Sequence, residues 1–123
     1  MSPRSGEFMA SAVARLAIAR AGLSADPAGA VSAAYYAAFY AARAALSERD
    51  RYAKTHGGTW HLFHEQLVVD GAFDPDLYRA AAAMQERREA ADYDAARMNE
   101  PEAAELIDVA ERFVTAVNDL LAG

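Results

Sequence analysis

Residues 32–43 read Ser-Ala-Ala-Tyr-Tyr-Ala-Ala-Phe-Tyr-Ala-Ala-Arg, a stretch rich in alanine and tyrosine. Alanine has the highest helix propensity, and the stretch contains neither glycine nor proline, so it predicts a helix. Tyr35, Phe39 and Arg43 share one stripe of that helix, and Tyr36 and Tyr40 share the neighbouring stripe. Two stripes of large rings indicate two buried faces, one against the core of the chain and one against a partner. We therefore predict a homodimer, and we take all four aromatic residues of this central helix as candidates for its interface.

Helix-capping residues, prolines and glycines on both sides of this stretch predict where further helices begin and end. Capping residues followed closely by proline occur at Asp26-Pro27, at Asp74-Pro75 and at Asn99-Glu100-Pro101, and a glycine follows several of the apolar segments. No segment alternates apolar and polar residues in the manner of a strand. The sequence thus predicts an all-α fold, an antiparallel up-and-down bundle of about five helices over residues 7–23, 27–48, 59–69, 75–97 and 100–122.

The length of 123 residues and the even composition predict a single domain over residues 1–123. We expect residues 1–8 to be a disordered leader or residues added in cloning, and we assign them no functional role. No apolar run approaches the roughly 20 residues of a membrane span. The chain has no cysteine, which suits a reducing compartment, so we expect a cytoplasmic protein without contact to a membrane.

The formal net charge of −6 argues against a general affinity for nucleic acid, but the charges are unevenly distributed. Residues 43–88 hold seven of the twelve Lys and Arg residues and all three His residues, whereas residues 89–123 hold nine acidic residues. A basic cleft within an acidic protein is therefore compatible with the sequence.

Two segments contain residue types that bind phosphate. Arg87 and Arg88 present two adjacent guanidinium groups, and Arg88 shares a helix face with Asp92, four residues on. An anion site and an ordinary solvated ion pair are equally compatible with this spacing. In the predicted loop 49–58, a bound phosphate could be surrounded by Lys54, His56 and the amide groups around Gly57, although a purely structural histidine and a glycine turn explain the same residues.

The sequence predicts neither a metal site nor a cofactor site. His61, His64 and Glu65 lie close together on the third predicted helix, but the order His-x-x-His-Glu matches neither common zinc-protease arrangement. Glycine-rich phosphate loops and the Gly-x-Ser-x-Gly motif of esterases are absent. Trp60 and Phe63, on the same helix, are predicted core residues.

Three blocks of sequence follow one another along the chain: the tyrosine-rich helix, Lys54-Thr55-His56-Gly57 and Arg87-Arg88-Glu89-Ala90-Ala91-Asp92-Tyr93. Taken together, they resemble the HEPN family (higher eukaryotes and prokaryotes nucleotide-binding). The resemblance covers residues 10–94 and implies an antiparallel helical bundle that is usually dimeric. Many HEPN proteins are the toxin of a toxin–antitoxin pair and are encoded beside a minimal nucleotidyltransferase. Active members are metal-independent ribonucleases that use an Arg and a His separated by four to six residues.

Two segments of this chain resemble that signature. Residues 51–56 have the literal spacing from Arg51 to His56, whereas residues 88–93 have the expected helical setting with Asp92 in the position of the histidine. The resemblance therefore implies catalytic roles for Arg88, Asp92 and His56, with His56 folding over Arg88 to supply the imidazole. It implies phosphate or nucleotide binding by Arg51, Lys54, Gly57 and Arg87, and it makes Tyr93 a candidate for modification by a partner nucleotidyltransferase.

The resemblance and the tyrosine-rich helix together leave three functions open. The protein is a ribonuclease toxin, a non-catalytic nucleotide- or RNA-binding subunit for a nucleotidyltransferase, or a dimeric interaction module. Because an aspartate is ionised at neutral pH, it is a poor general acid and repels RNA phosphates, which leaves catalysis open.

Overall fold

Five α-helices make up the computed structural model, which describes residues 1–94 and 98–123. They are α1 (Pro3–Gly22), α2 (Pro27–Glu48), α3 (His56–Phe63), α4 (Pro75–Tyr93) and α5 (Glu100–Ala122). A π-helical turn, η1 (His64–Val68), continues α3. The described residues contain no strand, which confirms the predicted all-α class.

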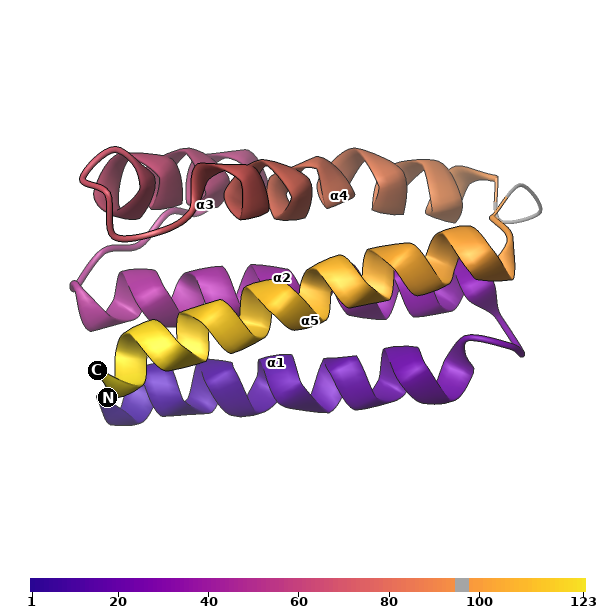
Figure 1. The fold of residues 1–123 in the computed structure, drawn as a ribbon, viewed down its shortest axis with the longest axis horizontal. Coiled ribbons are helices and arrows are strands. Elements are labelled where there is room, and N and C mark those ends of the chain that lie inside the picture. Colours follow the sequence, from indigo (N-terminus) through magenta and orange to yellow (C-terminus); the bar gives the residue numbers. More distant parts are fainter. Residues whose placement is uncertain (95–97) are drawn as a thin grey trace.

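Four long helices, α1, α2, α4 and α5, lie side by side and run alternately up and down (Figure 1). The two ends of the chain lie at the same end of the bundle (Figure 1). The short α3 belongs to the connection between α2 and α4 and packs against α2. The antiparallel bundle expected from the sequence is therefore confirmed, with α3 as an addition to a four-helix core.

Each long helix begins with a polar capping residue and a proline in its first two positions. The side-chain oxygen of the cap accepts a hydrogen bond from an amide of the first turn, as Asp26 does from Gly29 (3.0 Å) and Asn99 from Glu102 (2.9 Å). The proline lacks the amide hydrogen that would otherwise be unpaired there. The helix starts predicted after residues 26, 74 and 99 are confirmed.

The start of α1 differs from the prediction. Ser2 caps this helix and Pro3 follows, so residues 3–8 are helical and not a disordered leader. Ser5 is fully buried, and the Phe8 ring stacks on Tyr40 with the ring centroids 6.1 Å apart. The packing of the first turns against α2 fixes a segment whose sequence shows little apolar periodicity.

The start of α3 and the end of α4 also differ. Thr55, and not Thr59, caps α3, and its Oγ1 accepts a hydrogen bond from the Gly58 amide (2.9 Å). A Cβ at Gly58 would lie 2.8 Å from that oxygen, so the glycine permits the close cap and does not break the helix. Helix α4 ends at Tyr93, before the predicted end at Arg97, which lies outside the described residues.

Helix α2 is the centre of the bundle. Thirteen of its 22 residues are buried, and it contacts α1, α3, α4 and α5. Its many alanines let the neighbouring backbones approach closely, and the large rings of Tyr35, Phe63 and Phe113 fill the space between them. Trp60 is buried as well, so the prediction of Trp60 and Phe63 as core residues is confirmed. No described helix is long and apolar enough to cross a membrane.

Candidate functional site

A chain of hydrogen bonds from the core holds His56 at the first position of α3. The Trp60 indole Nε1–H donates to the Tyr35 hydroxyl oxygen (3.2 Å), and that hydroxyl lies 2.9 Å from Nδ1 of His56. Since the oxygen already accepts from Trp60, the arrangement is best satisfied when the hydroxyl donates its own hydrogen to Nδ1. A neutral His56 then carries its proton on Nε2, which has no hydrogen-bond partner among the described residues.

Aromatic rings of α2 fix the orientation of the imidazole. The His56 ring stacks on Phe39, with centroids 4.3 Å apart, and meets the Tyr36 ring edge-on at 5.8 Å. Side chains one helical turn apart on α2 thus form a wall for His56, which stays half-buried. This packing and the bond to Tyr35 leave the ring little freedom to rotate.

Arg88 of α4 lies on the same aromatic wall. Its guanidinium carbon is 5.3 Å from the centre of the Tyr35 ring and 5.5 Å from that of Tyr36, both within the range of a cation–π contact. Nη1 donates to Asp92 (2.9 Å), while Nε is buried and has no partner in the part of the chain that the structure describes. The side chain is only 17% exposed. Arg88 therefore keeps donor capacity in a largely desolvated position.

Arg43 places a second guanidinium group near His56. The guanidinium carbon lies 4.8 Å from the centre of the Phe39 ring and 5.3 Å from that of Tyr52. Arg43 forms no ion pair with any described residue, and its buried Nε lacks a hydrogen-bond partner there. We call Arg43, His56 and Arg88 the His56 cluster.

The electrostatics of the His56 cluster favour a neutral imidazole between two cations. Burial lowers the pKa of His56 below its usual value, and the positive charges of Arg88 and Arg43 lower it further. Glu89 opposes this shift. At neutral pH the cluster therefore combines two charged guanidinium groups with an uncharged N–H donor, a set that suits an oxyanion such as phosphate.

The structure brings His56 close to the pair of Arg88 and Asp92, an approach that the sequence suggested only through the family resemblance. Asp92 is half-exposed and pairs with Arg88 at the end of α4. Arg87 instead forms an ion pair with Glu102 of α5, and its guanidinium belongs to a different surface.

The other candidate residues lie around the His56 cluster and not within it. Arg51 and Lys54 are exposed in the loop before α3, without an ion pair to any residue in 1–94 or 98–123. Gly57 is the exposed second residue of α3, so this segment is helical and not the loop expected. Tyr93, the last residue of α4, is 94% exposed.

The aromatic residues assigned to a dimer interface have different environments. Tyr35 is fully buried and Phe39 is 4% exposed, both inside this chain, so neither can offer its ring to a partner. Tyr36 and Tyr40 are partly exposed. The alternation arises because α3 and α4 cover the stripe that contains Tyr35 and Phe39.

Arg43 is the cluster residue to which no functional role was assigned from the sequence, although its spacing places it on the stripe of Tyr35 and Phe39. It follows Phe39 by four residues, so the same stripe that predicted buried rings also placed a cation at its end. The position of a charged residue one helical turn beyond two aromatic residues on a predicted buried stripe was the sequence signal that could have identified Arg43.

The three residues considered as metal ligands, His61, His64 and Glu65, do not form a metal site in the described structure. Within the described ranges there is no group of three His, Asp or Glu side chains arranged to hold an ion. His61 pairs with Glu65 on the surface (2.9 Å), and the His64 ring packs beside Tyr78.

Comparison with known proteins agrees with the resemblance found in the sequence. The model of the HEPN domain matches residues 7–120, nearly the whole chain. The chain belongs to the HEPN family. It is also similar to UPF0332 protein glr0978 of Gloeobacter violaceus, with 33% identity over 94 residues, which is 75% of each chain. The His56 cluster lies wholly inside the matched HEPN domain.

Proposed function

We propose that this HEPN protein binds RNA through a backbone phosphate held at the His56 cluster, as a component of a toxin–antitoxin-type pair. The observation that carries the proposal is the convergence of Arg43, Arg88 and the Nε2–H group of His56 around one aromatic wall. Both guanidinium groups have a buried Nε–H without a partner in the described residues. Unpaired buried donors are costly, and a bound phosphate oxygen would satisfy them.

The placement of these cations also explains how an acidic protein could bind a polyanion. One third of the acidic residues lies on α5, and some of these form ion pairs, as Asp108 and Glu111 do with Arg20. Arg43 has no such partner among the described residues, and Arg88 has only the half-exposed Asp92 and the more distant Glu89. Arg43 is therefore a cation that no described carboxylate pairs with, available to a phosphate although the chain as a whole is negatively charged.

A second candidate function is metal-independent cleavage of RNA. In that reaction a base removes the proton of a ribose 2′-hydroxyl, whose oxygen bonds to phosphorus while the bond from phosphorus to the 5′-oxygen breaks and the 5′-oxygen takes a proton from water. His56 is held in the neutral form that a base requires, and Arg88 can stabilise the negative charge on the phosphorane. The reaction needs the tautomer in which Nδ1–H donates to Tyr35 and Nε2 is free. The observed hydrogen bonds favour the opposite tautomer, so binding is the better supported function.

Partners are proposed on the family resemblance alone. A homodimer would bring two His56 clusters into one assembly, with Tyr36 and Tyr40 as the remaining aromatic interface residues. A cognate minimal nucleotidyltransferase would find Tyr93 accessible for modification, because this side chain is almost completely exposed. Light scattering of the purified protein and co-purification with the product of a neighbouring gene test these two expectations.

The proposal is tested by fluorescence anisotropy with a labelled octa-adenylate RNA in EDTA. We expect Arg88→Gln and Arg43→Gln to weaken binding at least tenfold, since each charged hydrogen bond contributes about 1.5–3 kcal/mol. Arg112→Gln is the matched control, because Arg112 is exposed on α5 and distant in sequence from the cluster. Circular dichroism confirms that each variant is folded.

Salt dependence and gel analysis of the same samples complete the test. Loss of one phosphate contact should make the slope of log K against log salt less negative by about 0.7. Cleavage that disappears in both His56→Ala and Arg88→Gln would establish the ribonuclease. Binding without cleavage supports the binding subunit, and equal affinity of wild type and both arginine variants would refute the proposal.

A further inference from the structure

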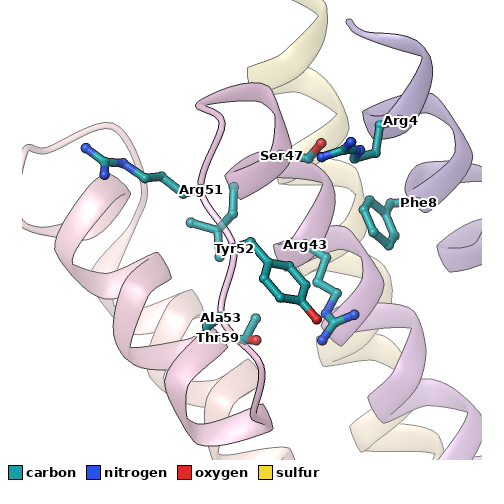
Figure 2. Close-up of a pocket in the computed structure, with 9 residues that line it drawn as sticks. Arg4, Phe8, Arg43, Ser47, Arg51, Tyr52, Ala53 and Thr59 are labelled. Atoms are coloured by element: carbon teal, nitrogen blue, oxygen red, sulfur yellow. The ribbon is translucent and has the colours of Figure 1, made fainter.

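A pocket lies next to the His56 cluster, where the first turns of α1 meet the end of α2 and the following loop. Its volume is about 190 Å³, and no acidic residue lines it. Figure 2 shows the aromatic ring of Tyr52 beside the guanidinium group of Arg43, with Phe8 on the opposite side. Arg43 thus belongs both to this pocket and to the His56 cluster.

The pocket combines cations with ring surfaces. The guanidinium group of Arg4 points toward the hydroxyl of Ser47, whereas Arg51, which also lines the pocket, points away from it (Figure 2). Neither Arg4 nor Arg43 forms an ion pair with a described residue. Glu48, next to Ser47, accepts hydrogen bonds from the Ser2 amide (2.9 and 3.2 Å), which directs this carboxylate to the start of α1. No carboxylate therefore lines this pocket, and the nearby Glu48 and Asp50 line the adjacent surface on the other side of Arg4 and Ser47.

Tyr52 has the properties of a stacking platform. Its side chain is 67% exposed, although Arg43 already lies over its ring at 5.3 Å. An exposed aromatic ring beside an unpaired arginine is the combination that single-stranded nucleic acid uses, the base stacking on the ring and the phosphate bonding to the cation. The volume is also suitable for one planar ring, because an engineered cavity of about 150 Å³ is large enough for benzene.

We propose that this pocket is a nucleotide subsite, in which one base stacks on Tyr52 and its phosphate is held by Arg4 and Arg43. The inference rests on the proposed function, because Arg43 would then contact the backbone of a single RNA strand between this base and the phosphate at His56. The subsite would select single-stranded RNA, since a base in a duplex cannot leave its stack without a cost of a few kcal/mol.

Anisotropy with the octa-adenylate RNA tests the subsite through Tyr52. Tyr52→Ala should weaken binding about 5- to 150-fold, the range observed for loss of one base–aromatic stack, whereas Tyr52→Phe should bind within about twofold of wild type. Arg4→Gln should weaken binding, and Arg112→Gln should not. Circular dichroism again verifies folding, and the exposure of Tyr52 makes unfolding by these changes unexpected.

Combinations of results separate this inference from the proposed function. If Arg88→Gln weakens RNA binding and both Tyr52→Ala and Arg4→Gln bind as wild type, the subsite is refuted and the His56 cluster stands. If wild type binds no RNA, titration with adenosine 5′-monophosphate decides the matter. Binding of this nucleotide that Tyr52→Ala abolishes supports a site for a free nucleotide, and no binding of either probe overturns the subsite.

Discussion

The Tyr35 hydroxyl connects the core to the candidate site, and Tyr35→Phe removes it without removing the ring. Tyr35 is fully buried, so the Trp60 indole N–H that donates to it would lose its acceptor in a place that water does not reach. An orphaned buried donor costs about 1–3 kcal/mol. His56 is half-buried, so its Nδ1 can recover a bond to water and adds little to this cost. We expect a loss of about 2 kcal/mol.

The size of this effect is measurable in a chain of this length. At roughly 2.1 cal/mol/K of unfolding entropy per residue, a loss of about 2 kcal/mol lowers Tm by about 8 °C. Urea unfolding followed by circular dichroism at pH 7.5 gives the free energy directly if the transition is two-state. The measurement should show a lower midpoint with an unchanged m-value.

Tyr40→Phe is the matched control for this experiment. Tyr40 also lies on α2 and is partly buried, but its hydroxyl has no hydrogen-bond partner among the described residues. Its removal should change the free energy of unfolding by less than about 0.5 kcal/mol. Equal stability of Tyr35→Phe and Tyr40→Phe would refute the idea that the hydroxyl bridges Trp60 and His56.

Three further predictions concern pH and the glycines of α3. Because the folded protein lowers the pKa of His56, the unfolded chain binds more protons below about pH 6.5, so stability should be complete above that pH and fall as the pH decreases. His56→Gln should flatten this part of the curve of Tm against pH, and an unchanged pH dependence would contradict the assignment. Gly58→Ala should destabilise by about 0.5–2 kcal/mol, since the added Cβ would meet Oγ1 of the Thr55 cap at 2.8 Å. A Cβ at Gly57 would meet no atom within 4 Å, so Gly57→Ala should be neutral or stabilise by up to about 1 kcal/mol. A lower Tm for Gly57→Ala than for Gly58→Ala would contradict the described cap.

The sequence predicted the helices best where local signals and core packing agree. The cap-and-proline pairs at Asp26, Asp74 and Asn99 set three helix starts correctly because a cap acts within its own first turn. Ser2-Pro3 is the same signal, but it precedes residues whose burial depends on α2 and cannot be read locally. At α3, the glycine pair indicated a break, whereas the tight bond from Gly58 to Thr55 uses the missing side chain to start the helix.

The candidate site was less predictable because it joins three helices. Residue spacing placed Tyr35, Phe39 and Arg43 on one stripe of α2, and Arg88 with Asp92 on one face of α4. Which face of α4 meets that stripe is a tertiary property, and only the family resemblance suggested that His56 approaches Arg88. Its position on the Tyr36 and Phe39 rings, together with the hydrogen bond to Tyr35, required the structure.

The chain contains one tryptophan, and its indole N–H is two hydrogen bonds away from the outer nitrogen of His56. Trp60 is therefore an intrinsic fluorescent probe of the site. Its emission should change when His56 gains a proton or when Nε2–H of His56 donates a hydrogen bond to a phosphate. Neither event needs a dye or a change in the fold to become visible. Binding of RNA or a nucleotide at His56 can thus be followed by the fluorescence of Trp60. Binding elsewhere on the surface should leave that fluorescence unchanged.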